Sequence, residues 1–135
     1  MQKKHIFLAF FLIFLQYGFS QISYSESQIR NFIEEVYAAQ SEDLVFQNPE
    51  RHKVINMFFL NINIELRNDI DINKKFDNYL DLPLNNKYNP QLQKDNMFSI
   101  QSFNPLKYKA PMFPQKSKIY RLGNTQYLLI INPLK

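Results

Sequence analysis

The sequence predicts an α+β domain, with two N-terminal helices packed on a small antiparallel sheet that ends in a C-terminal β-hairpin. Three observations indicate this class. Apolar residues recur at helical spacing in two segments, polar and apolar residues alternate over residues 61–66, and two β-rich runs flank a Gly-Asn pair near the C-terminus. Because each element has an apolar side to bury, helices and sheet are expected to share one core.

The first twenty residues are expected to lie outside this domain, as a signal peptide over residues 1–20. Lys3 and Lys4 precede an unbroken apolar run, and small residues lead to Ser20. This order is typical of a secretory signal, with cleavage expected between Ser20 and Gln21. The apolar run is far shorter than the ~20 residues that cross a bilayer. We therefore expect a secreted or periplasmic protein with no transmembrane segment in its mature form.

The remaining residues, 21–135, are expected to form a single α+β domain. They contain no Cys, so no disulfide and no thiolate metal site is available. Gly123 is their only glycine, which excludes the glycine-rich loops that bind nucleotide phosphates. We expect no cofactor and no metal.

The first helix is predicted over residues 26–40. Ser23 and Ser25 each stand three residues before Glu or Gln, the pattern of a capping box. One apolar helix face follows, consisting of Ile29, Phe32, Ile33, Val36 and Tyr37.

A second helix is predicted to open at Asn48-Pro49-Glu50, where Asn caps and Pro occupies the first helical position. Apolar residues continue at helical spacing until the alternating segment 61–66 indicates a strand. An all-strand interpretation of residues 54–66 is an alternative. Residues 67–96 carry no clear pattern, and residues 97–103 are predicted as a short strand between turns at Asn-Pro pairs.

The C-terminal hairpin is predicted from two β-rich runs, residues 119–122 and 125–131, joined by a two-residue Gly123-Asn124 loop. In that register Tyr120 opposes Tyr127. The run 128–131 has lost its alternation, so we expect both of its faces to be covered, either as a central strand or as a strand with a helix lying over it.

Charge is distributed unevenly along the domain. Residues 21–71 hold four basic and nine acidic residues, whereas residues 72–135 hold ten basic and three acidic ones. Either the two halves face each other across a complementary boundary, or the basic half faces an anionic partner. In the second case the candidate contacts, which are interleaved with tyrosines, are Lys107, Lys109, Lys116, Lys118 and Arg121.

Export makes nucleic acid an unexpected partner for these cations and favours an envelope protein or an anionic glycan or lipid surface. The competing interpretation is that Tyr108 and Tyr120 belong to the core while the lysines solvate its edge.

Catalytic candidates are few. His52 is the only histidine of the mature chain, and its interpretation as a surface helix residue is favoured over a general base. Asp69, Asp71 and Asn73 imitate the start of a calcium loop, but Lys74 stands where that loop needs glycine. We therefore assign no catalytic residue and no metal ligand.

Three segments, Asn86–Pro90, Phe103–Tyr108 and Tyr120–Tyr127, resemble small exported proteins of Bacteroidetes-type bacteria that have no assigned function. The resemblance covers about half of the mature chain. It implies export and assigns no functional residue.

Three function classes remain. The first is a non-catalytic cell-envelope domain that binds a macromolecular partner. The second is a small-ligand binder with an apolar cavity lined by Phe and Tyr. The third is a small hydrolase that uses His52 or a carboxylate pair among Glu65, Asp69, Asp71 and Asp81.

Overall fold

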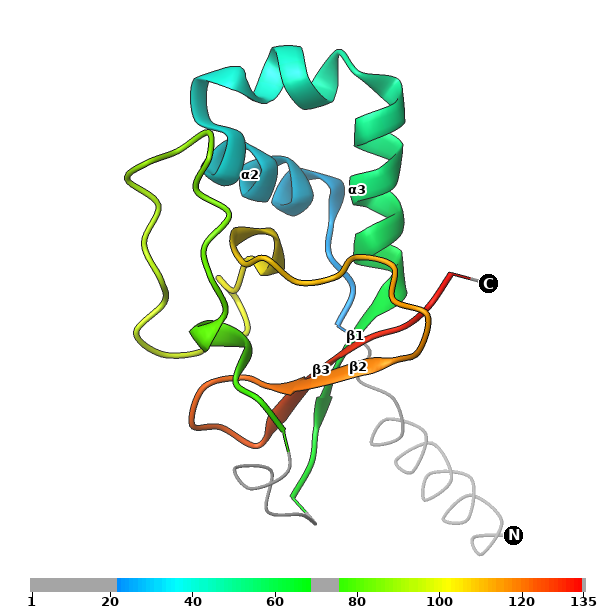
Figure 1. Ribbon diagram of the computed structural model, residues 1–135, viewed down its shortest axis with the longest axis vertical. Coiled ribbons are helices and arrows are strands. Elements are labelled where there is room, and N and C mark those ends of the chain that lie inside the picture. Colours follow the sequence, from blue (N-terminus) through cyan, green and yellow to red (C-terminus); the bar gives the residue numbers. More distant parts are fainter. Residues whose placement is uncertain (1–21, 69–75, 135) are drawn as a thin grey trace, which may run out of the picture.

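The computed structural model describes residues 22–68 and 76–134. Within these residues, two α-helices, α2 (Glu26–Tyr37) and α3 (Pro49–Asn61), come first, and three strands form one sheet: β1 (Ile62–Leu66), β2 (Lys118–Arg121) and β3 (Tyr127–Ile131). Figure 1 shows both helices on one side of the sheet, with the irregular chain of residues 76–117 running beside them. The predicted α+β class, helices followed by a small antiparallel sheet, is confirmed.

The start of α2 follows the predicted capping pattern. The Ser25 hydroxyl accepts a hydrogen bond from the Gln28 backbone N–H at 3.2 Å. The apolar face that the spacing predicts is buried at Phe32, Ile33 and Val36. The helix ends at Tyr37 because Ala38 has a positive φ of 49°.

The chain after α2 stays helical in two short pieces, η1 (Ala38–Gln40) and the π-helical turn η2 (Glu42–Phe46). The predicted helix over residues 26–40 is therefore correct in position but changes type at Ala38.

Helix α3 begins as predicted, since the Asn48 side chain accepts a hydrogen bond from the Arg51 N–H at 3.1 Å and Pro49 occupies the first turn. The helix runs directly into β1 at Ile62, so the all-strand alternative for residues 54–66 is wrong. Phe58 and Phe59 of α3 are buried with Ile62 and Ile64 of β1 in one hydrophobic cluster.

Strand β3 is the middle strand, because the order in the sheet is β1-β3-β2 and both pairings are antiparallel. The neighbours Leu128 and Leu129 are 2% and 0% exposed. Successive side chains of a strand point to opposite faces. The prediction of a central strand covered on both faces is confirmed at these two positions.

The hairpin loop is longer than predicted. Tyr120 pairs with Leu129 and not with Tyr127, so five residues, 122–126, connect the strands. The cause is Thr125, whose hydroxyl donates to the Leu122 carbonyl at 2.6 Å and accepts from the Tyr127 N–H at 3.1 Å. These bonds close the loop two residues later than a Gly-Asn turn would.

The predicted strand over residues 97–103 is wrong. Turns fill this segment instead, with the N–H groups of Ser102 and Phe103 both donating to the Ser99 carbonyl, at 3.2 and 2.9 Å. The turn places Asn104 next to α2. Asn104 is fully buried, and its side-chain amide donates a hydrogen bond to the Phe32 carbonyl at 3.1 Å. An extended strand would not place this amide at the helix.

Candidate functional site

Lys107, the first of the predicted partner contacts, lies inside the molecule and is 6% exposed. It belongs to the short helical turn η4 (Pro105–Lys107). Its ammonium lies 3.0 Å from Asp95 Oδ1 and 3.6 Å from Glu35 Oε1 of α2. In the described part of the chain, this lysine belongs to the basic half and forms an ion pair with Glu35 of the acidic half. The two carboxylates balance its positive charge inside the molecule.

Arg121 is also engaged within the chain. Its Nε donates to the Phe76 carbonyl at 3.1 Å, and an Nη donates to the Gly123 carbonyl at 3.0 Å. Its backbone N–H donates to the Asp77 carbonyl at 2.9 Å. The guanidinium therefore holds the hairpin loop and the chain that follows residue 75 against β2.

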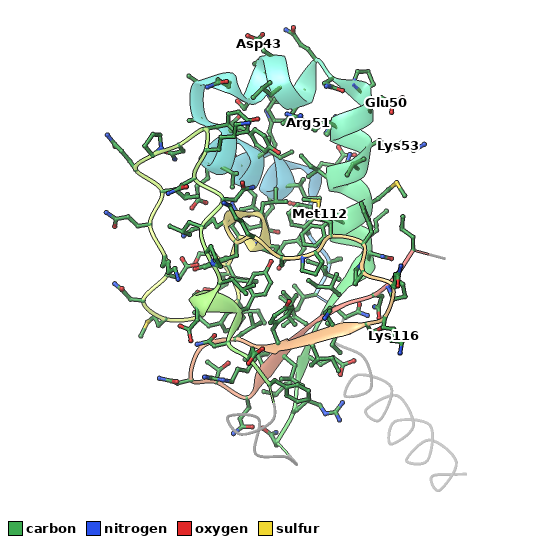
Figure 2. All side chains as sticks on the ribbon, in the orientation of Figure 1. Asp43, Glu50, Arg51, Lys53, Met112 and Lys116 are labelled. Atoms are coloured by element: carbon green, nitrogen blue, oxygen red, sulfur yellow. The ribbon has the colours of Figure 1, made fainter. Side chains whose placement is uncertain are left out.

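The three remaining predicted contacts, Lys109, Lys116 and Lys118, are exposed. The structure separates them into two places. Lys109 borders a pocket beside η4, whereas Lys116 and Lys118 flank the start of β2 (Figure 2 labels Lys116 there).

A junction of three segments lies next to Lys116 and Lys118. The Ser117 hydroxyl donates to Asn132 Oδ1 at 3.0 Å. The Asn132 N–H donates to the Asn61 carbonyl at 3.1 Å, and the Asn61 side-chain amide donates to the Asn132 carbonyl at 2.7 Å. These bonds tie the start of β2, the chain after β3 and the end of α3 together.

Two exposed leucines lie beside this junction, one residue before Asn61 and two after Asn132. Leu60 is 86% exposed and Leu134 is 48% exposed. These leucines and the two lysines each lie within two residues of a junction residue, and we call the set the seam surface: Leu60, Lys116, Lys118 and Leu134. The sequence pattern missed the leucines, because it could not show that α3 ends in a way that turns Leu60 to solvent.

His52 lies in a hollow of about 370 Å³ that Ser27 and Arg30 also line. Its ring contacts the Phe46 ring edge-on, with 5.7 Å between centroids. Within the described ranges no hydrogen bond joins the imidazole to a hydroxyl or carboxylate, and the Ser27 hydroxyl pairs with the Ser25 hydroxyl at 3.2 Å. The hollow therefore contains no nucleophile–base pair of the kind that the hydrolase hypothesis needs.

The carboxylates named for that hypothesis are not gathered at one point. Glu65 pairs with Arg67 at 3.2 Å, and Asp81 is exposed in the short turn η3 (Tyr79–Asp81). Asp69 and Asp71, and with them the calcium-like segment, lie outside the described residues.

Two further findings concern only residues 22–68 and 76–134. Among them, no cluster of three or more His, Cys, Asp or Glu side chains could hold a metal ion. None of their helices combines the length and the apolar character that spanning a membrane requires. The expected signal peptide and its cleavage point also lie outside these ranges.

No protein-family model, no curated protein and no solved structure matches this chain.

Proposed function

We propose that the protein is an exported, non-catalytic domain of the cell envelope that docks on an anionic lipid surface through the seam surface. The observation that supports this proposal is the junction of Ser117, Asn132 and Asn61, because its three segments carry two exposed lysines and two exposed leucines within two residues of it. An ammonium near an anionic leaflet gains about 1 kcal/mol. The leucines add to this by leaving water.

A lipid surface suits this combination better than a glycan does. Lys116 and Lys118 can contact phosphate headgroups while Leu60 and Leu134 enter the apolar boundary below them. A glycan offers anionic groups but no apolar phase for side chains as exposed as Leu60.

Co-sedimentation with lipid vesicles tests the proposal. The purified protein is expected to bind vesicles of phosphatidylglycerol and phosphatidylcholine, and not vesicles of phosphatidylcholine alone. The double variant Lys116→Gln/Lys118→Gln removes two headgroup contacts, so we expect binding to weaken about thirtyfold. Lys87→Gln/Lys94→Gln, which makes the same change of charge on exposed residues elsewhere, is the matched control.

If both double variants weaken vesicle binding equally, binding depends only on the net charge of the protein. That result would contradict a defined binding surface. Binding to heparin with the same dependence on Lys116 and Lys118, but none to vesicles, would assign the surface to an anionic glycan. Leu60→Gln is a further check. Because Leu60 is 86% exposed, the substitution should leave the fold intact, and the loss of its apolar contact with the membrane should weaken vesicle binding.

Export is tested separately by the intact mass of the protein recovered from cells. We expect the mature chain to begin at Gln21 and to be found outside the cytoplasm. An intact Met1 on cytosolic material would contradict the export part of the proposal.

A further inference from the structure

A pocket of about 450 Å³ lies away from the seam surface, between α3, η4 and the chain that follows η4. Its inner wall is apolar and aromatic, with Phe58 2%, Tyr79 0% and Leu106 3% exposed. Ala110 and Met112 border it as partly buried residues, and Figure 2 labels Met112 in the segment between η4 and β2. The volume is within the range of about 300–1,000 Å³ that small-molecule sites occupy.

The tyrosine hydroxyls of this wall are already hydrogen-bonded within the protein. The Tyr79 hydroxyl donates to the Pro105 carbonyl at 2.8 Å, and the Tyr108 hydroxyl donates to Asp95 Oδ2 at 2.8 Å. A ligand therefore meets the tyrosine rings as apolar surface.

Two polar side chains of the pocket have no such partner. Considering only the residues that the structure describes, neither the Asn85 amide nor the Lys109 ammonium takes part in a hydrogen bond or ion pair. Asn85 is half-buried and Lys109 is exposed. An amide N–H donor and a cation are thus available at the edge of an apolar pocket.

The backbone of both residues is held in place by a short antiparallel bridge. Leu84 pairs with Tyr108, the Asn85 N–H donates to the Lys107 carbonyl at 2.7 Å, and the Lys109 N–H donates to the Pro83 carbonyl at 2.8 Å. The burial of Lys107 with Asp95 strengthens this wall. The two donor side chains therefore extend from backbone positions that one ladder fixes.

We propose that this pocket binds a small amphipathic carboxylic acid. Its apolar part packs against Phe58, Leu106 and Met112, and its carboxylate accepts hydrogen bonds from the Lys109 ammonium and the Asn85 amide. A carboxylate is the complementary group because lysine and the amide nitrogen both donate, and a charge-assisted bond from lysine is stronger than a neutral one.

The probes are octanoate and its neutral analogue octanamide. Their binding is followed in NMR titrations through the backbone amide chemical shifts of the purified protein. Octanoate is expected to shift the resonances of residues around the pocket and to bind more tightly than octanamide. Lys109→Gln should weaken octanoate about tenfold, the size of one charge-assisted hydrogen bond, and leave octanamide unchanged. Lys53→Gln removes the same charge at an exposed position outside both the pocket and the seam surface and should leave both affinities unchanged.

Ala110→Phe provides a second test, because a ring added at the edge of the pocket should block both probes. The same variant should still bind anionic vesicles, which separates failure of this site from failure of the seam surface. Equal affinities for octanoate and octanamide, or octanoate shifts that survive both Lys109→Gln and Ala110→Phe, would overturn the proposal. Because Lys109 is exposed, Lys109→Gln should fold normally. It therefore tests octanoate binding at the pocket even if Ala110→Phe does not fold.

Discussion

The Lys107 ammonium lies 3.0 Å from Asp95 Oδ1 in a place where the lysine is only 6% exposed. Asp95 also accepts from the Tyr108 hydroxyl at 2.8 Å, and its own N–H donates to that hydroxyl at 2.9 Å. This cluster holds the irregular chain before η4 against η4 itself. The cluster therefore has a structural role.

Lys107→Met is expected to lower the free energy of unfolding by about 2 kcal/mol, because Asp95 and Glu35 lose a buried counter-ion. The partial exposure of both carboxylates, 28% and 42%, keeps the loss below that of a fully buried pair. Urea unfolding measures the change. Lys109→Met, at an exposed position, is the matched control and should change the stability by less than about 0.5 kcal/mol. Equal stabilities of the two variants would contradict the structural role of Lys107.

Stability is expected to fall at alkaline pH. Burial raises the pKa of Tyr79 and of Tyr108 above the ordinary value of 10.0. Below pH 10 both states keep these protons, whereas above it the unfolded chain releases protons that the folded chain retains. Each tyrosine then lowers the free energy of unfolding by up to about 1.4 kcal/mol per pH unit.

Tyr79→Phe checks this dependence through urea unfolding at a series of pH values. The variant loses the hydrogen bond to Pro105 and should be less stable at neutral pH by about 1–2 kcal/mol. Above pH 10 its stability should decline less steeply than that of the wild type. If the stabilities of the variant and the wild type decline equally steeply above pH 10, Tyr79 does not contribute to the alkaline loss of stability.

Gly123→Ala should destabilise the hairpin by about 1–2 kcal/mol, because Gly123 has a φ of 62°, where a Cβ is strained. The added Cβ would meet Leu80 Cδ1 at 3.4 Å and Phe98 Cβ at 3.5 Å, which are ordinary contacts. The cost therefore comes from the backbone. Gly123→Asn, which tolerates this conformation better, should cost less in thermal unfolding, and the reverse order would point to crowding instead.

Asn48→Ala should lower the stability by about 1 kcal/mol, since it removes the side-chain acceptor for the Arg51 N–H at the start of α3. Asn48→Asp keeps an acceptor at this position and should restore most of the loss. Thermal unfolding followed by circular dichroism measures both variants. No difference between them would show that the cap contributes little.

The predictions from sequence succeeded where the determining interactions are local. Ser25 and Asn48 cap the helices that follow them within three residues, and the alternation after Asn61 marks β1. Thr125 shows the limit. Its hydroxyl bridges Leu122 and Tyr127 and lengthens the hairpin loop. The β-rich runs on either side of Gly123 do not indicate this longer loop.

Elements that depend on distant partners could not be predicted. The π-helical turn η2 is stabilised by Arg30 of α2, whose guanidinium lies 4.0 Å from the centre of the Phe46 ring and 2.8 Å from Glu42. Lys107 looks like any other lysine of the basic segment until the fold brings Glu35 to it. The seam surface was equally invisible, because Asn61 and Asn132 meet only in the folded chain.

The strand order has a consequence for how this chain is made. The middle strand, residues 127–131, is synthesised after both of its neighbours, and β1 and β2 have no partner in the sheet until it arrives. A nascent chain cannot complete the sheet while residues 127–131 are still in the ribosome, and such non-local pairing forms slowly. Both edge strands therefore leave the ribosome before the strand that joins them is available.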